Sequence, residues 1–299
     1  MKAFTAAAIQ VAPRPGPLTV GSIRSNVDHC VTMVERCVAE TGAELVVLPE
    51  SATTGFTPGC PPEHLWELLA PSAVAPLHEV AGRLGIHLVF GSYERGPAPG
   101  TVHNAAHLIG PDGATLATYH KTHLFHGEAA ADGGWVTPGD AAVVVRTPLG
   151  SIGLMICFDG DYPELARVMA VRGAEIICRP SALLRSADIW ELTNRARAYD
   201  NHVYVVGANA TGTDPAGVIY FGNSMIVTPI AEVVARAASH EGWVSARLDP
   251  ESALRSLTPG SNVAQRFDHL GDRNLAFIKG HLDELAAPAH TSFPRGTPT

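Results

Sequence analysis

The feature of this sequence that most directly suggests chemistry is Cys157, which lies in the run GLMICFDGDYPE of residues 153–164. The apolar residues 151–156 predict a strand that ends at the thiol. Pro163 predicts that a helix begins shortly after it, because proline is favoured in a first helical turn. The backbone N–H groups and dipole of a helix N-terminus favour a thiolate. The alternative is a buried strand cysteine, since free cysteine is among the most buried residue types.

Two other charged residues follow predicted strands. The apolar run of residues 43–50 ends in the carboxylate of Glu50, and Lys121 comes just after the short strand pattern of residues 114–118. Taken singly, each is equally consistent with an ordinary surface charge. Together with Cys157, in the order Glu, Lys, Cys and each at a strand end, they resemble the nitrilase superfamily of carbon–nitrogen hydrolases.

The resemblance covers most of the chain, from about Lys2 to Leu257. Glu50 and Lys121 are 71 residues apart, Lys121 and Cys157 are 36 residues apart, and both spacings fit the family. It implies a four-layer α-β-β-α sandwich, in which two β-sheets pack face to face with helices outside. It also implies a reaction that requires neither a metal nor a cofactor.

The residue types themselves indicate acyl transfer. A thiol with an ordinary pKa of about 8.5 is mostly protonated at neutral pH and needs a base or a cation to become a nucleophile. Glu50 can accept the sulfhydryl proton and later activate water. Lys121 can stabilise the thiolate and then the oxyanion, together with the backbone N–H of Phe158. The predicted reaction attacks an amide or nitrile carbon, releases ammonia or an amine, and hydrolyses a Cys157 thioester.

Further site residues are expected around this triad. Many members of the family carry a second glutamate that positions the lysine and the substrate amide, and Glu128 stands at the matching place; the alternative is a surface carboxylate. Asp159 is predicted to anchor the cysteine turn by hydrogen bonds. Aromatic candidates for the pocket wall, which are also consistent with ordinary core, are Phe56, Trp135, Phe158 and Tyr162.

Asp161 departs from the commonest pattern of small amidase-like branches, Cys-Tyr-Asp-x-Arg-Phe-Pro-Glu, which has arginine at this position. If Asp161 faces the pocket, we expect a neutral or cationic substrate rather than an acidic one. The segment also resembles the aliphatic-amidase pattern Cys-x-Asp-Gly-x-x-Pro-Glu through Gly160, and the Cys-Trp-Glu of true nitrilases is absent. A linear amide is therefore favoured, with N-carbamoyl amines or amino acids and nitriles as alternatives. The loops of residues 58–62, 127–138 and 183–188 are expected to decide among them.

Two rival functions remain at this point. His120, His123 and His126 fall within seven residues, and together with Glu128 as a base they would suit a zinc hydrolase. Spacings of three and six, however, place the first and last on different sides of a strand or a helix. The second rival is a binding module that keeps the fold without activity, which the presence of all three triad types disfavours.

Composition indicates the class of protein. The 299 residues are 46% hydrophobic and 17% charged, enough to fill a sizeable core. The net charge of −8, with no basic run, makes nucleic acid and anionic membranes poor partner hypotheses. Five cysteines without a C-x-x-C pair indicate a reducing compartment. The absence of a signal-peptide core and of a long apolar run favours a cytoplasmic protein.

Strand patterns alternate with helical ones, which predicts layered α/β structure with mixed sheets. Predicted strands cover residues 3–11, 45–48, 87–93, 102–109, 114–118, 142–147, 151–156, 175–178, 203–208, 221–229 and 242–248. Predicted helices cover residues 22–41, 63–69, 75–84, 163–172, 187–201 and 250–257. We assign residues 1–258 to one domain and residues 259–299 to a tail without clear periodicity, which frays or lies across a neighbour.

The resemblance also implies pairing through the helices next to the nucleophile, residues 163–172 and 187–201, and a tail that crosses to the partner subunit. We therefore expect a homodimer or a larger even-numbered assembly. Apolar anchors would come from the second helix, with arginines at the rim of the interface. The anchors would be Ile189 and Trp190, and the rim residues Arg195 and Arg197; Leu192 is a further apolar candidate.

Overall fold

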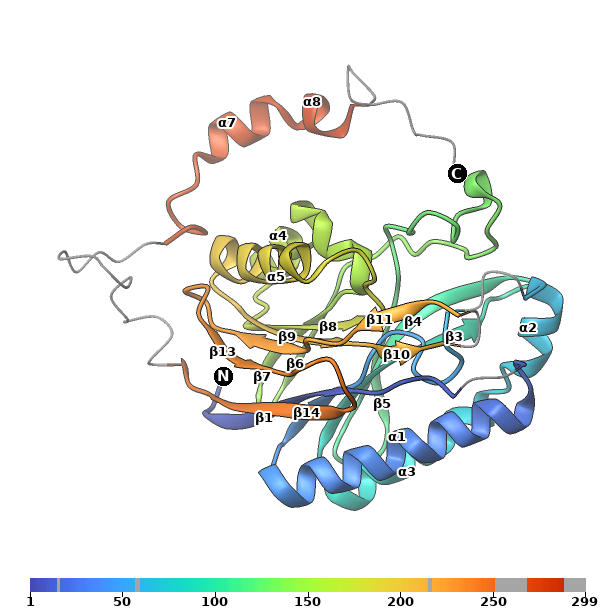
Figure 1. Ribbon diagram of the computed structural model, residues 1–299. Helices are drawn as coiled ribbons and strands as arrows, with labels where there is room; N and C mark the ends of the chain where they lie inside the picture. The colour runs from blue at the N-terminus through green and yellow to red at the C-terminus, as the bar shows by residue number, and fades with distance from the viewer. Residues whose placement is uncertain (15–16, 57–59, 215–216, 251–267, 288–299) are drawn as a thin grey trace.

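The computed structural model describes residues 1–14, 17–56, 60–214, 217–250 and 268–287. Two six-stranded sheets form its centre (Figure 1). The first has the order β14-β1-β2-β3-β4-β5, with β1 Phe4–Gln10, β2 Leu45–Val47, β3 His87–Arg95, β4 Val102–Ile109, β5 Thr115–His120 and β14 Gly242–Leu248. The second has the order β13-β12-β9-β8-β7-β6, with β6 Val143–Thr147, β7 Gly150–Leu154, β8 Ile176–Ser181, β9 Tyr204–Asn209, β12 Met225–Val227 and β13 Val233–Arg236.

Helices cover the outer faces of both sheets (Figure 1). α1 (Val20–Thr41) and α3 (Ala75–Leu84) lie on the first sheet, and α4 (Pro163–Val171) and α5 (Ala187–Asn201) lie on the second. One apolar cluster fills the space between the sheets, and another lies between the first sheet and its helices. This arrangement confirms the predicted α-β-β-α sandwich. Shorter elements are α2 (Pro62–Leu68), η1 (Pro71–Val74), η2 (Ala130–Asp132), η3 (Cys157–Asp161), β10 (Thr211–Thr213), β11 (Ile219–Phe221), α7 (Leu275–Gly280) and α8 (Leu282–Ala286).

Local signals in the sequence explain where α1 begins and ends. The side chain of Thr19 accepts a hydrogen bond from the backbone N–H of Ser22, and the side chain of Ser22 accepts one from Thr19 in return. Gly42 ends the helix at a φ of 65°, which a glycine adopts without steric strain. Between these caps, apolar residues recur at spacings of three and four and form the buried face of the helix.

The sequence-based elements differ from the structure in several places. The single strand expected over residues 221–229 is interrupted, because Gly222 and Asn223 both have positive φ angles, and β11 ends before them while β12 begins after them. β13 was not expected. The helix expected at residues 250–257 falls almost wholly outside the described residues, as do residues 259–267 and 288–299 of the tail. The described part of the tail contains α7 and α8, although no periodicity was recognised there.

α5 carries the individual residues that the sequence suggested for an interface, and two of these assignments are wrong. Trp190 is fully buried, and its indole N–H donates to the carbonyl of Asn223 at 2.7 Å, so it belongs to the core of its own subunit. Arg197 is also buried and donates to the carbonyl of Gly160 at 3.0 Å. By contrast, Leu192 on the outer side of α5 is 61% exposed.

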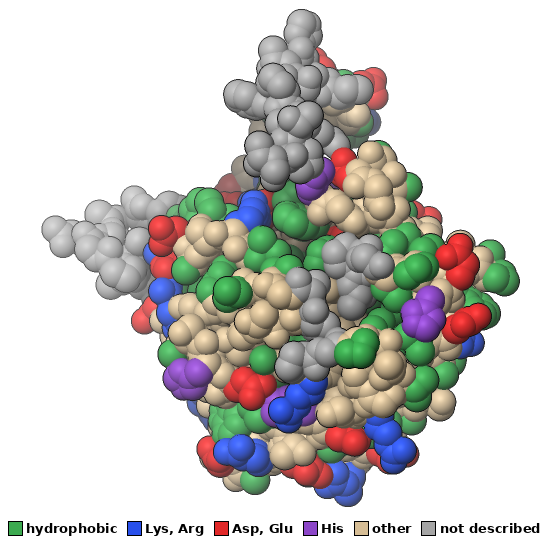
Figure 2. Space-filling view, turned by 45° about the vertical axis from the view of Figure 1, so that its right-hand side comes forward, with side chains coloured by type: hydrophobic (Ala, Val, Ile, Leu, Met, Phe, Trp, Pro, Cys, Tyr) green, Lys and Arg blue, Asp and Glu red, His purple; other side chains and the backbone are tan. Residues whose placement is uncertain are grey.

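Two surface properties bear on partners. Acidic and basic side chains are interspersed over the described residues visible in Figure 2, without a basic cluster on that face. Within the described part of the chain, every helix is too short or too polar to cross a bilayer.

Candidate active site

The strand directions bring the three predicted catalytic residues to one end of the sandwich. β1, β2 and β3 run parallel, as do β7, β8 and β9, so the carboxyl ends of the inner strands of each sheet lie together. Glu50 follows β2, Lys121 follows β5, and Cys157 follows β7. The two sheets meet at this point, where the backbone N–H of Glu50 donates to the carbonyl of Ser181 at 3.4 Å.

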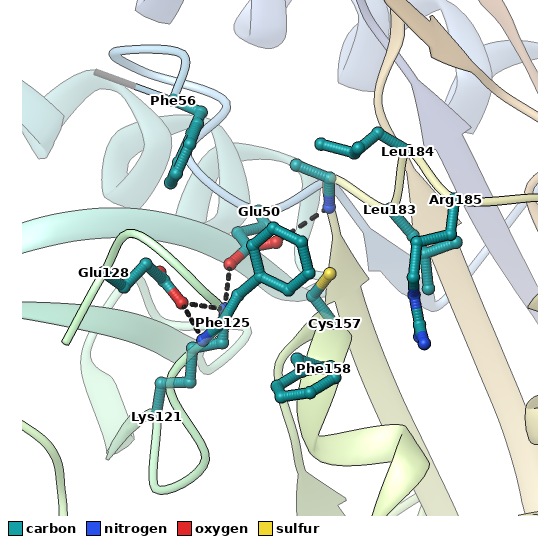
Figure 3. A pocket seen from close by; sticks show the side chains of 11 residues that line it. Glu50, Phe56, Lys121, Phe125, Glu128, Cys157, Phe158, Leu183, Leu184 and Arg185 are labelled. Atoms are coloured by element: carbon teal, nitrogen blue, oxygen red, sulfur yellow. Dashed lines mark hydrogen bonds and ion pairs between the residues drawn. The ribbon is translucent and has the colours of Figure 1, made fainter. Parts of the chain in front are cut away.

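Lys121 lies between two carboxylates (Figure 3). Its Nζ donates to Oε1 of Glu50 at 2.8 Å and to Oε2 of Glu128 at 2.7 Å, and all three side chains are buried. Burial alone lowers the pKa of Lys121, but the charges of Glu128 and Glu50 outweigh it and hold the pKa well above its ordinary value. The site therefore favours the charged form of the lysine, which has no lone pair with which to act as the base.

Asn104 was not recognised from the sequence, yet it joins the same two carboxylates. Its Nδ2 donates to Oε1 of Glu50 at 2.7 Å and to Oε1 of Glu128 at 2.8 Å. The remaining oxygen of Glu50, Oε2, accepts from the backbone N–H of Ala182 at 2.8 Å. Glu128 is thus part of a buried network and not a surface carboxylate.

The surroundings of Cys157 favour the protonated thiol. Burial raises the pKa of the Cys157 thiol well above its ordinary value, and the negative charge of Glu50 raises it further, while Lys121 and Arg179 act in the opposite direction. Burial thus opposes the preference for a thiolate that is expected from the adjoining helical turn. A base must remove the thiol proton before the sulfur can attack.

Arg179, on β8, holds the strained turn that presents the thiol, and it was not predicted from the sequence. Cys157 has a φ of 44°, which is rare for a residue with a side chain. The carbonyl of Cys157 accepts from Nε of Arg179 at 3.0 Å and from Nη2 at 2.5 Å. A Cβ at position 160 would lie 2.1 Å from Cζ of Arg179, so this position requires the Gly160 seen in the sequence.

Side chains of α5 hold Arg179 in place. Its Nη1 donates to Oγ1 of Thr193 at 2.9 Å and to Oδ1 of Asn194 at 2.8 Å, and its guanidinium lies over the ring of Trp190. Burial lowers the pKa of Arg179 to about 10, which still leaves it charged at neutral pH. The Trp190 side chain thus supports the cysteine turn from within one subunit.

Asp159 anchors the other side of the turn, as predicted. Its Oδ2 accepts from the hydroxyl of Tyr119 and from the backbone N–H of Ile156, both at 2.8 Å. Its Oδ1 accepts from the backbone N–H of His123 at 3.0 Å and from Oγ1 of Thr122 at 3.2 Å. These bonds tie the cysteine turn to the loop that carries Lys121.

The four acid–base and nucleophile candidates line one narrow pocket with a cavity volume of about 20 Å³. Its walls are mostly apolar (Figure 3), and their larger apolar side chains are Phe56, Phe125, Phe158, Leu183 and Leu184. Two of these, Phe56 and Phe158, were expected. Phe125, Leu183 and Leu184 were missed, although residues 183 and 184 belong to a loop that the sequence marked as decisive for specificity.

Three residues expected in the pocket do not line it. Trp135 packs edge-on against Tyr93, with ring centroids 5.2 Å apart. Tyr162 stacks on His123 at 4.0 Å and borders a neighbouring hollow. Asp161 accepts two hydrogen bonds from Arg185, at 2.7 Å each. These assignments are wrong because none of the three side chains lines the pocket, and each has a close partner elsewhere in the fold or, for Asp161, in the pocket wall itself.

Arg185 replaces Asp161 as the charged residue at the pocket wall. The carboxylate of Asp161 forms an ion pair with this guanidinium, which also lies 5.4 Å from the centre of the Phe158 ring. Lys121 is enclosed between its two carboxylates, so Arg185 is the other cation among the described residues that line this pocket. The expectation of a neutral or cationic substrate depended on Asp161 facing the pocket, and that condition is not met.

The three histidines that are close in sequence each have a different partner. His120 bonds to Glu94, His123 bonds to Asp159, and Nδ1 of His126 lies 3.5 Å from a carboxylate oxygen of Asp132. Among the described residues, no group of three or more His, Cys, Asp or Glu side chains is arranged to hold a metal ion. The geometry gives the zinc hypothesis no support.

Comparison with known proteins agrees with this geometry. The family model for carbon-nitrogen hydrolases matches residues 5–254. Omega-amidase NIT2 of Homo sapiens is 35% identical over 240 residues, which is 78% of this chain and 86% of that protein.

Solved structures give the same result. A carbon-nitrogen hydrolase from Helicobacter pylori G27 superposes with a TM-score of 0.79 at 27% identity, covering 94% of this chain and 98% of that one. Nit3 of Saccharomyces cerevisiae, a member of branch 10 of the nitrilase superfamily, does so with a TM-score of 0.74 at 28% identity, covering 84% of this chain and 91% of that one.

Proposed function

The chain belongs to the carbon–nitrogen hydrolase family, and we propose that Cys157 is the nucleophile with which it hydrolyses a small linear amide. It is an enzyme of the amidase type. The observation that carries the proposed site is the convergence of Cys157, Glu50, Lys121 and Glu128 on one pocket. A protonated thiol, a buried carboxylate and a cation are the groups that acyl transfer to sulfur needs.

In the proposed mechanism, the carboxylate of Glu50 takes the proton from Sγ of Cys157 as the sulfur attacks the amide carbon. The oxyanion that forms is stabilised by Nζ of Lys121 and the backbone N–H of Phe158. Glu50 then gives its proton to the leaving nitrogen, so that ammonia or an amine departs and a thioester remains. Glu50 next takes a proton from the water that attacks the thioester and returns it to the departing sulfur, which releases the acid and restores both the thiol and the carboxylate.

Glu128 has a supporting role in this proposal. The charge of Glu128 contributes to the raised pKa of Lys121. Its Oε2 also accepts from the backbone N–H of Phe125 at 2.7 Å, which fixes the loop at the pocket wall. Glu128 thereby favours the protonated form of Lys121 and holds its Nζ in position beside Glu50.

A screen of ammonia release tests the proposed function. We expect turnover of linear amides and inactivation by iodoacetamide but not by metal chelators. Turnover confined to N-carbamoyl amines or to nitriles would assign the same site to an alternative reaction. Inactivation by chelators with resistance to alkylation would contradict the proposal.

A second, narrower candidate is a substrate with a carboxylate at the end remote from its amide. The observation that favours it is Arg185, because a guanidinium pairs well with a carboxylate and still has free N–H groups when Asp161 occupies two. The name of the human relative, omega-amidase, points in the same direction. The apolar walls would then contact the chain between the two groups.

Replacing Arg185 with glutamine tests this candidate. We expect KM for an ω-amide acid to rise about 10-fold or more, because a hydrogen bond to a charged group contributes about 1.5–3 kcal/mol. The uncharged amide of the same length is the matched control and should keep its KM within about threefold. Equal effects on both substrates would show that Arg185 shapes the pocket without binding a carboxylate.

We also propose that the enzyme is a homodimer or a larger even-numbered assembly that pairs through α4 and α5. With Trp190 and Arg197 in the core, the apolar anchors would be side chains on the outer faces of these helices. Leu192 on α5 is 61% exposed, and Val171 on α4 is 55% exposed. Burying such side chains favours association by about 1.5–3 kcal/mol each.

Leu192→Asp should therefore dissociate the assembly, which sedimentation at micromolar concentration would detect as a fall in mass. Ile219→Asp is the matched control, since Ile219 is 73% exposed on β11, away from α4 and α5. The proposed interface would be wrong if the wild type sediments as a monomer, or if Leu192→Asp keeps the wild-type mass.

We further propose a cytoplasmic location. The support is the chemistry of the cysteines, because all five are free thiols, two of them buried in α1. A reducing compartment keeps such thiols unpaired. Fractionation of the source cells tests this proposal, and recovery of the enzyme with exported proteins would contradict it.

A further inference from the structure

We propose that Asn104 is a positioning residue that makes Oε2 of Glu50 the atom which removes the proton from Cys157. The proposal rests on Glu50 being the base of the proposed mechanism. Asn104 is fully buried on β4, and its backbone carbonyl also accepts from the backbone N–H of Lys121 at 2.8 Å. It therefore contacts each charged member of the network.

The first step is a count of lone pairs on Glu50. A carboxylate offers about four acceptor positions, two on each oxygen. Oε1 accepts from Asn104 at 2.7 Å and from Lys121 at 2.8 Å, which fills its two positions. Oε2 accepts from the backbone N–H of Ala182 at 2.8 Å, which leaves one position open. That position is the one available for the thiol proton.

The second step concerns orientation. The Asn104 amide bridges Oε1 of Glu50 and Oε1 of Glu128, while Lys121 bridges the same two carboxylates through Oε1 of Glu50 and Oε2 of Glu128. These four contacts form a closed ring. Within it, neither carboxylate can rotate without breaking a hydrogen bond in a buried site. Oε2 is therefore held in a fixed orientation at the wall of the pocket that Glu50 shares with Cys157 (Figure 3).

The third step concerns charge. Asn104 is neutral, so Glu50, Glu128 and Lys121 together keep one net negative charge, which is what a general base requires. A cation in place of Asn104 would neutralise the group, and a carboxylate would add repulsion between like charges in a buried site. Only a neutral side chain with two N–H donors satisfies both carboxylates without changing their charge.

The test compares Asn104→Leu and Asn104→Asp, which are similar in size to asparagine, with Glu50→Gln and a control. The control is Asn201→Leu. Asn201 is a buried asparagine whose Nδ2 donates to the carbonyl of Arg197 at 2.9 Å, and among the described contacts its Oδ1 has no hydrogen-bond partner, as is also the case for Asn104. Rates are expressed per native site, counted by labelling Cys157 with iodoacetamide to completion.

We expect Asn104→Leu to lower kcat at least about 10-fold with KM within about threefold, because a misaligned base slows proton transfer more than binding. Asn104→Asp should lose at least as much. The second-order rate of iodoacetamide alkylation should fall in proportion, since it too requires proton removal from the thiol. Asn201→Leu should stay within about twofold of wild type in both measurements, and Glu50→Gln should be the slowest variant.

The proposal is overturned if Asn104→Leu keeps kcat within about twofold of wild type while Glu50→Gln is impaired, or if Asn201→Leu loses as much as Asn104→Leu. It is also overturned if neither Asn104 variant folds, because Asn104 is then a folding residue. Full activity of Glu50→Gln would instead overturn the proposed function, so the two failures are distinguishable.

Discussion

Cys157→Ala is expected to abolish turnover and leave the fold intact. The alanine removes one sulfur atom from the wall of an open pocket, whereas the proposed reaction loses the atom that forms the thioester. Activity should fall below about 1% of wild type, and the melting temperature should change little. Ammonia release from the best amide at high enzyme concentration measures the first, and thermal unfolding measures the second.

Cys157→Ser is the companion variant. A hydroxyl has a much higher pKa than a thiol, and burial opposes its ionisation further, so the base cannot activate it well. We expect nearly the same loss as for alanine. Retention of more than a few per cent of wild-type activity in Cys157→Ala would refute the assignment of the nucleophile.

Lys121→Ala is expected to have the second-largest effect, on both rate and stability. Its removal deletes the proposed oxyanion donor, which should lower kcat at least about 100-fold. It also leaves Glu50 and Glu128 buried without their cation, and breaking such a buried network destabilises a protein by about 3–5 kcal/mol. Steady-state kinetics and chemical denaturation measure the two effects.

Lys121→Arg is the matched control for charge. It keeps the cation, but a forked guanidinium is too large and too differently shaped to replace an ammonium with two carboxylate partners at 2.7 and 2.8 Å. We expect it to be more stable than Lys121→Ala yet similarly slow. A change confined to KM in Lys121→Ala would assign the lysine to substrate binding instead of catalysis.

The sequence was most informative where a polar residue ends an apolar strand. Glu50, Lys121 and Cys157 could be placed together because each follows a strand, and parallel strands bring such ends together. The boundaries of α3 and β14 matched their predicted ranges, and α3 ends directly before Gly85, which caps it. The family resemblance added Glu128, which no periodicity would have indicated.

Other site residues could not be predicted, for physical reasons. Asn104 and Arg179 lie inside strands, where an isolated polar residue gives no sign of the distant partner that satisfies it. Trp190 on α5 shows the opposite problem. An apolar residue in a helix indicates a buried face, but its spacing cannot tell whether the cover comes from the same subunit or from another.

Contacts between residues that are far apart in sequence also determine which side chains line the pocket. Asp161 is close to Cys157 in sequence, yet its carboxylate is paired with Arg185, from the loop after β8, and does not line the pocket. Tyr162 is likewise engaged by His123. Sequence proximity to a nucleophile is therefore a weak guide to which side chains contact a substrate.

The most direct test of the central claim is the mass of the enzyme during turnover. A p-nitrophenyl ester that carries the acyl group of the best amide should acylate the enzyme faster than water deacylates it. After an acid quench, we expect the mass of one acyl group on the peptide that contains Cys157, removable by neutral hydroxylamine as a thioester is, and no adduct on Cys157→Ala. Turnover without any covalent adduct, or with the acyl group on another residue, would contradict the account.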